Sequence, residues 1–193
     1  MRRIVPIALL ATSLLLSGCG SSKAKEQPAP TPDVLPRAAT PDIWARRVVD
    51  FLLRPLNKDL VIIQNFDNPQ IRIFIASRNA TALRVIRKRL NDLGGCSTQL
   101  TIIGRPPAGA AAAYSRINDH LHKACKAYED VAAKLLEATN LLASGNKDDA
   151  SRGADMVATA HDPSARAARE LTAGIKIAQG LAPFRRAGLQ PSV

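Results

Sequence analysis

Apolar residues after position 40 recur mainly at three- and four-residue steps, with charged residues between them. This spacing places the apolar side chains on one face of a helix and predicts amphipathic helices that pack against one another. Thr40 supplies a capping hydroxyl and Pro41 suits the first helical position, so a helix is expected to begin here. Pro55 is expected to kink or end it. The inward positions of this helix are Trp44, Val48, Phe51, Leu52 and Leu56.

Residues 60–75 are ambiguous between helix and strand. Residues 71–75 alternate in polarity as a strand would, yet they also fit a helix that continues to residue 93. We favour the helix, because a strand would need a partner and only residues 60–63 and 100–103 offer one. Gly94 and Gly95 predict the end of this helix, through a left-handed cap.

The second half of the chain predicts one long helix and two shorter ones. A break over residues 104–109 precedes the long helix, which extends to about residue 143. A turn follows at Ser144-Gly145-Asn146, and the residues around Asp148 and Asp162 suit two further helix starts. Successive helices with short links predict an all-α fold, an antiparallel bundle of four to five helices. The buried stripe of the long helix is Tyr114, Ile117, Leu121, Cys125, Tyr128, Ala132, Leu135 and Leu142.

The chain begins Met1-Arg2-Arg3 and continues with an apolar run over residues 4–16, a pattern typical of a secretion signal. The run is shorter than the roughly 20 residues that a permanent membrane span needs. It ends in Leu16-Ser17-Gly18-Cys19, which resembles the lipobox of bacterial lipoproteins. The resemblance implies cleavage before Cys19 and attachment of a diacylglycerol, with acyl chains such as palmitate, to its thiol. The protein would then be lipid-anchored on the extracytoplasmic face of the cell membrane. The alternative is an ordinary cleaved signal with a coincidental cysteine.

Four segments are expected from this pattern. Residues 1–18 form the cleaved signal peptide, and residues 19–41, rich in Pro, Ser, Lys and Ala, form a flexible lipidated tether. Residues 42–185 form the helical bundle. Residues 186–193 form a disordered tail.

Two cysteines remain for the bundle, Cys96 and Cys125. In an oxidising compartment such a pair is most simply a disulfide. It would close a loop of about 30 residues and contribute on the order of 3 to 4 kcal/mol in the chain-entropy model. Two buried free thiols or a metal site are the alternatives.

The chain is basic, with 27 Lys and Arg against 16 Asp and Glu and a formal net charge of +11. Much of the excess lies in residues 42–93, where Arg84, Arg87 and Lys88 share one helical face opposite an apolar one. Near a membrane such a strip could bind anionic lipid headgroups or an anionic envelope polymer. A solvated basic face is the alternative. Nucleic acid is not expected, because aromatic residues do not interleave with the basic ones.

The chain shows no recognisable catalytic motif, neither a nucleophile elbow nor a phosphate-binding glycine loop, and adjacent carboxylates lie on predicted helix surfaces. Asp119, His120, His122 and Cys125 come nearest to a metal cluster. His120 and His122 point to different faces, however, and Cys125 is better used in a disulfide. We therefore expect no catalytic residue, metal or cofactor.

These features predict a non-enzymatic, lipid-anchored binding or scaffolding module of the cell envelope with an unknown protein partner. One alternative is a small-ligand or metal-binding carrier, which would gather polar groups such as Asp119, His122 and Tyr128 around a pocket. Others are a cell-wall hydrolase and an exclusion or immunity lipoprotein.

Overall fold

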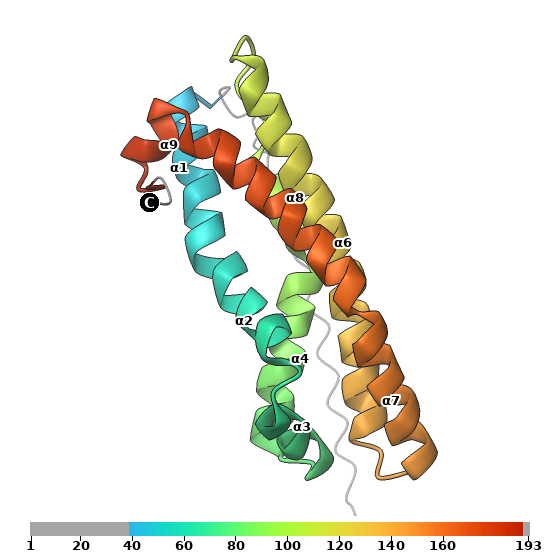
Figure 1. Ribbon diagram of the computed structural model, residues 1–193. Helices are drawn as coiled ribbons and strands as arrows, with labels where there is room; N and C mark the ends of the chain where they lie inside the picture. Colours follow the sequence, from blue (N-terminus) through green and yellow to red (C-terminus); the bar gives the residue numbers. More distant parts are fainter. Residues whose placement is uncertain (1–38, 191–193) are drawn as a thin grey trace, which may run out of the picture. The chain divides into compact units, whose positions relative to one another are not determined.

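A computed structural model describes residues 39–190. The predicted signal peptide, Cys19 and nearly all of the expected tether lie outside these residues. Within them every regular element is a helix (Figure 1), so the all-α prediction is confirmed. The elements are α1 (Pro41–Phe51), the π-helix η1 (Leu52–Leu56), α2 (Asn57–Asn65), α3 (Pro69–Ala76), α4 (Ala80–Gly94), α5 (Cys96–Ile103), α6 (Ala112–Leu142), α7 (Lys147–Thr159), α8 (His161–Gln179) and α9 (Ala182–Arg186).

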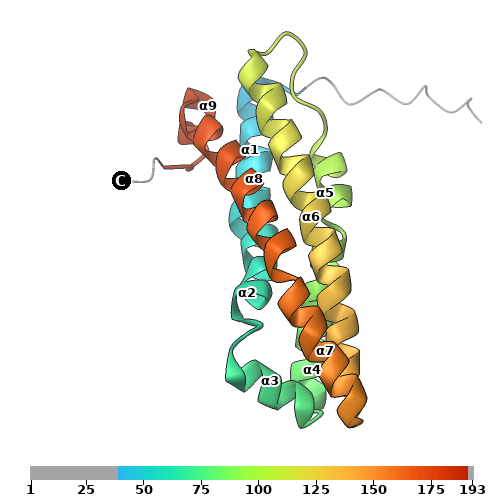
Figure 2. The same cartoon turned by 45° about the vertical axis from the view of Figure 1, so that its right-hand side comes forward.

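Four rods of alternating direction form the bundle (Figures 1 and 2). The first is α1–η1–α2, the second α4–α5, the third α6, and the fourth α7–α8. Helix α6, 31 residues long, lies between the others, with α7 and α8 packed along one side and α4 and α5 along another. The predicted antiparallel bundle is therefore confirmed. None of the helices in residues 39–190 is long and apolar enough to cross a membrane.

The first rod passes through Pro55 without ending. Proline lacks an N–H and its ring collides with the preceding turn of a regular α-helix, and the wider π turn at η1 accommodates both. The Thr40 hydroxyl accepts a hydrogen bond from the N–H of Ile43 at 3.3 Å, as the capping prediction requires. Five apolar side chains of this rod are buried as predicted: Trp44, Val48, Phe51, Leu52 and Leu56.

Residues 60–63, 71–75 and 100–103 are all helical, so none of the three candidate segments forms a strand. The predicted single helix from residue 71 to residue 93 is nevertheless wrong, because a polar turn over residues 77–79 divides it into α3 and α4. Asn68 and Asn79 each accept a hydrogen bond from a backbone N–H two or three residues later and begin α3 and α4. Gly95 ends α4 with φ −100°, not with the expected left-handed cap, and α5 starts directly after it.

The core runs the length of α6, and all of the predicted stripe except Leu142, which is half-buried, lies inside it. An aromatic cluster joins α1, α6 and α9, with ring centroids of Trp44 5.8 Å from those of Tyr114 and Phe184. The tail expected from residue 186 is described as far as residue 190. There Leu189 is buried and its N–H donates to the carbonyl of Phe184 at 3.0 Å.

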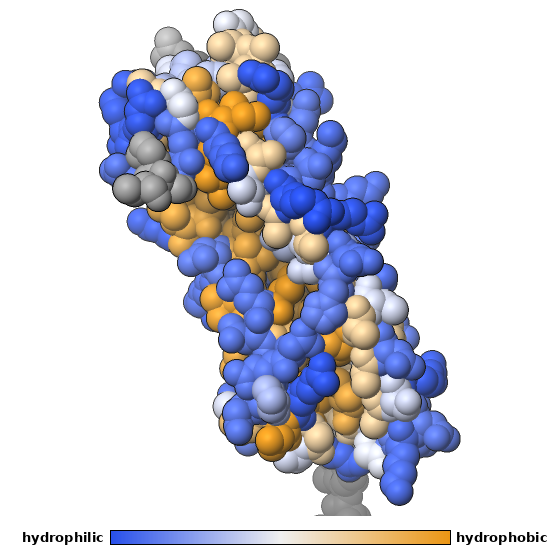
Figure 3. Space-filling view, viewed as in Figure 1, coloured by the Kyte–Doolittle hydropathy of each residue, from blue (hydrophilic) through white to orange (hydrophobic). Residues whose placement is uncertain are grey.

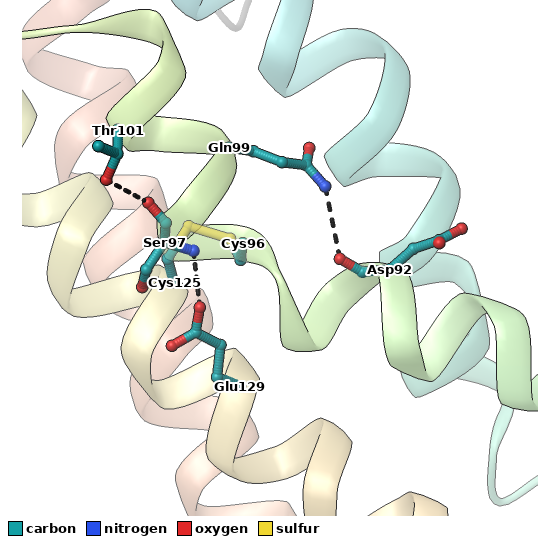
Figure 4. Close-up of a disulfide and its surroundings, with 7 residues drawn as sticks. All are labelled: Asp92, Cys96, Ser97, Gln99, Thr101, Cys125 and Glu129. Carbon is teal, nitrogen blue, oxygen red and sulfur yellow. Dashed lines mark hydrogen bonds between the residues drawn. A yellow bond between two sulfur atoms is a disulfide. The ribbon is translucent and has the colours of Figure 1, made fainter.

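A disulfide joins Cys96, the first residue of α5, to Cys125 in the middle of α6 (Figure 4), which confirms the predicted pair. The two Cα atoms are 5.2 Å apart, and both residues are buried. Glu129, one turn further along α6, accepts a hydrogen bond from the N–H of Ser97 at 2.7 Å. Its carboxylate therefore satisfies a free N–H in the first turn of α5.

Candidate functional site

Arg84, Arg87 and Lys88 are exposed on the outer face of α4, and the predicted apolar face of the same helix is buried. Arg78, in the turn before α4, joins them along one shallow opening. These four cations are called the α4 basic surface below. Leu83 also lines this opening, and Asp92 is the one acidic residue there.

Internal contacts hold part of the α4 basic surface in place. Arg78 donates to the carbonyl of Ser144 at 2.7 Å, and Arg87 donates to the side-chain oxygen of Asn140 at 2.9 Å, so both guanidinium groups lie against the end of α6. Lys88 pairs with Asp92 at 2.6 Å. Arg84 makes no hydrogen bond or ion pair with any other described residue, which leaves its guanidinium available to a partner.

Arg89 points away from this surface. Its Nη1 donates to a carboxylate oxygen of Asp59 at 3.1 Å, and Asp59 is only 3% exposed. Burial raises the pKa of Asp59 above its ordinary value of 3.8, although the hydrogen bond from Arg89 acts in the opposite direction. The pair joins α2 to α4 and is structural.

The residues nearest to a metal cluster in the sequence lie apart. Cys125 is oxidised, so it has no thiolate to offer, and His122 is exposed. His120 contacts Glu170 instead, with 2.7 Å between Nδ1 and Oε2, and links α6 to α8. Over residues 39–190 no group of three or more His, Cys, Asp or Glu is arranged to hold a metal ion.

A cavity of about 200 Å³ lies between the end of α2, the middle of α6 and the α7–α8 junction. Apolar side chains are visible in the hollow between α2 and α8 (Figure 3). At its rim, Nε2 of His161 lies 3.0 Å from a carboxylate oxygen of Asp67, whose other oxygen accepts from Arg72 at 2.9 Å. The lining residues are Ile63, Gln64, Phe66, Asp67, Val131, Leu135, Val157, Ala160, His161 and Ser164.

Sequence reasoning missed this cavity. The polar groups proposed for a carrier do not line it. Asp119 and His122 are exposed elsewhere on α6, and Tyr128 is buried in the core, where burial raises its pKa to about 12. Asp67 and His161 are far apart in the sequence, and no local pattern indicates that they meet.

A second group of cations lies along the groove between α6 and α8. Lys123, Lys126 and Lys134 come from α6, and Arg166 faces them from α8, with Asp130 and Glu170 in the same groove. The long helix alone is nearly balanced in charge, so the sequence did not single out this face. It is more mixed in sign than the α4 basic surface.

No protein-family model matches this chain, and neither does any curated protein or solved structure. The α4 basic surface and the cavity at His161 are therefore the features from which a function is inferred.

Proposed function

We propose that this protein is a lipid-anchored, non-enzymatic binding or scaffolding module on the extracytoplasmic face of the membrane, and that its α4 basic surface binds an anionic component of the cell envelope. The lipobox resemblance at residues 16–19 supports the anchor. The basic excess of the first half of the bundle supports the choice of an anionic partner.

The observation that carries the proposal is the state of Arg84, which is exposed and unpaired among the described residues between two arginines that are held in place. A guanidinium group binds phosphate and carboxylate through two parallel hydrogen bonds. Because Arg78 and Arg87 are already positioned, less side-chain entropy is lost when they bind.

The arrangement suits a ligand with several negative charges. Arg84 and Lys88 are four residues apart, about 6 Å along the helix axis, and Arg87 lies between them. Repeated phosphates on an envelope polymer, or neighbouring lipid headgroups, offer charges at comparable intervals. A single small anion would engage only part of the surface.

The test compares two variants that each remove three positive charges. One carries Arg84→Ser, Arg87→Ser and Lys88→Ser, and the matched control carries Lys123→Ser, Lys126→Ser and Lys134→Ser in the α6–α8 groove. At about 1 kcal/mol per cation, the first variant should bind anionic vesicles or isolated envelope polymer at least tenfold more weakly at low salt. The control should stay within about twofold of the unmodified protein.

Cosedimentation measures both variants, and circular dichroism checks that both are folded. Binding to the polymer but not to vesicles would identify the polymer as the partner, and the reverse would identify headgroups. Equal losses in the two variants would contradict a site on α4 and indicate a general charge effect.

A second test seeks the partner in cells. Crosslinking of the anchored protein, followed by mass spectrometry of protein, lipid and polysaccharide, should recover one reproducible species. That species should be lost from the triple α4 variant and kept in the α6 control. Recovery at the same level from the α4 variant would remove the basic surface from the proposal.

The cavity at His161 supports a second candidate function, a small-ligand carrier. It combines an apolar floor with polar groups at its rim, but about 200 Å³ is below the roughly 300–1,000 Å³ of most ligand sites. Native mass spectrometry of the protein purified from cells should then show one small bound species. Ser164→Leu, which projects into the cavity, should abolish it, and Ala165→Leu, on the exposed neighbour, should not.

A further inference from the structure

One end of the bundle brings together the start of α1, the end of α5 and the start of α6. The indole N–H of Trp44 donates to the carbonyl of Gly104 at 3.0 Å, and the Trp44 ring lies beside Tyr114. Phe184 of α9 completes the aromatic cluster beneath them. We call this the α1 end; α3 and the turn after α6 lie at the opposite end (Figures 1 and 2).

The α1 end exposes apolar surface. Ile102 is 78% exposed, more than any other large apolar residue among those described, and Ile43 is 48% exposed. The loop that follows α5 and the first two residues of α6 continue this surface, because residues 106–113 contain only proline, alanine and glycine. Ala108, Ala111 and Ala112 are exposed there.

Cations flank this apolar surface. Arg47 donates to the carbonyl of Ile103 at 3.4 Å, which fixes its guanidinium beside Ile102. Arg46 and Arg105 are exposed and make no hydrogen bond or ion pair with any residue in 39–190. The acid of this end, Asp42, is already paired with Arg186 at 2.6 Å.

We infer that the α1 end rests on an anionic lipid bilayer, with Ile102 and the alanine-rich loop inserted shallowly and Arg47 and Arg105 at the headgroups. Exposed apolar side chains with a rim of arginines are typical of surfaces that lie at a membrane interface. This inference rests on the proposed lipid anchor at Cys19.

The short stretch of chain between Cys19 and the first helix supports the bilayer as the partner of this surface. Pro41 lies at the α1 end, and about 20 residues separate it from Cys19. Fully extended, a chain of that length would reach about 75 Å, but a flexible one has ends on the order of 25 Å apart, about half the roughly 46 Å length of α6. The lipid would therefore keep this end, and not the opposite one, close to the headgroups.

A second copy of the chain fits this surface less well. In a two-fold symmetric dimer the same patch faces itself, so arginines 46, 47 and 105 of one copy would meet those of the other. Repulsion would oppose such an interface, whereas phosphate headgroups complement the same charges.

Contact between the α1 end and the bilayer would also limit the kinds of anionic partner that the α4 basic surface can reach. Helix α4 begins near the end opposite to the α1 end (Figure 2), and Arg78 and Ser144 meet there. With the α1 end on the lipid, the α4 basic surface would lie on the side of the bundle, toward the end remote from the headgroups. An envelope polymer or protein, in place of lipid, is then the anionic partner that it can reach.

The test uses the full-length lipidated protein in vesicles of phosphatidylglycerol and phosphatidylcholine that contain brominated lipid. Ile102→Trp places a fluorophore at the α1 end, and Ile73→Trp is the matched control on α3, where the native side chain is 54% exposed. Trp44 gives both variants the same background. Bromine should quench the added tryptophan at 102 at least twofold more than the one at 73, and Arg47→Ser with Arg105→Ser should halve that difference.

Flotation and quenching together distinguish failure of the α1 end as the membrane face from failure of the lipid anchor. Protein that floats with the vesicles but shows equal quenching at both positions, or stronger quenching at 73, overturns the α1 end as the membrane face and leaves the anchor intact. Protein that does not float overturns the anchor and this inference together.

Discussion

At the scale of single residues, the ion pair between Asp59 and Arg89 is the one whose acidic side chain is most deeply buried among the described residues. Because burial raises the pKa of Asp59, the folded protein holds the proton of this carboxyl more tightly than the unfolded chain does. This contribution to stability is present below about pH 4 and is lost as the pH rises through the raised pKa. The free energy of unfolding of Asp59→Asn should therefore improve relative to the unmodified protein between pH 3.5 and pH 7. A difference that is constant with pH in denaturant titrations would contradict the raised pKa.

Removal of the other partner should be costly. Arg89→Met leaves an ionised Asp59 buried without its hydrogen-bond donor. We expect a loss of about 2 to 3 kcal/mol at pH 7, less than the 3 to 5 kcal/mol of a fully buried pair, because the Arg89 side chain is 23% exposed. The loss should shrink as the pH falls toward 4, because burial raises the pKa of Asp59 and a protonated carboxyl needs no cationic partner, and chemical denaturation at the two pH values measures it.

Two helical glycines should respond in opposite directions to alanine. A Cβ on Gly153 would lie 3.0 Å from Leu142 Cγ and 3.1 Å from the backbone oxygen of Ala138, where α7 approaches α6. Gly153→Ala should therefore cost about 1 to 2 kcal/mol, since this crowding outweighs the gain in helix propensity. Gly94 has nothing within 4 Å of an added Cβ, so Gly94→Ala should stabilise by about 0.5 to 1 kcal/mol. Thermal unfolding of the two variants distinguishes these signs.

At the scale of elements, the disulfide between α5 and α6 is the strongest single constraint. It spans 29 residues, and the chain-entropy model gives about 3 to 4 kcal/mol for a loop of that length. Cys96→Ser with Cys125→Ser should lower the free energy of unfolding by this amount and leave the helical signal intact. A double variant as stable as the native protein would show that packing of α5 alone holds this contact.

Some helix boundaries follow from the local sequence pattern and others do not. The periodicity of residues 112–142 is long and regular, and α6 follows it closely. Residues 57–94 contain equally apolar stretches, yet they form three separate helices. The breaks come at Asn68 and Asn79, because an asparagine side chain can accept a hydrogen bond from a backbone N–H and so begin a new helix. At Pro55 the local sequence predicts a kink or a break, yet the rod is continuous. Leu52 and Leu56, on either side of the proline, are buried in the core and favour the continuous rod.

At the scale of the whole molecule, the proposed anchor should decide where the protein is found. Cys19→Ala removes the thiol that would carry the diacylglycerol, and no helix in residues 39–190 could replace it as a membrane span. We expect this variant to leave the membrane pellet almost completely, with the fold unchanged in circular dichroism. Retention in the pellet after a high-salt wash would exclude lipidation as the main anchor.

The sequence by itself determined the helical class and the buried faces of the first rod and of α6, because periodicity and capping act over a few residues. It also indicated the disulfide partners, because Cys96 and Cys125 are the two cysteines that remain once Cys19 is assigned to the expected lipobox. It also placed Arg84, Arg87 and Lys88 on one face of α4. Only the tertiary structure decided what lies beside them. Arg87 meets Asn140, 53 residues away, and Asp67 meets His161, and neither contact has a local signature. The cavity and the α1 end depend on how rods distant in the chain pack together, and that is settled by the whole core at once.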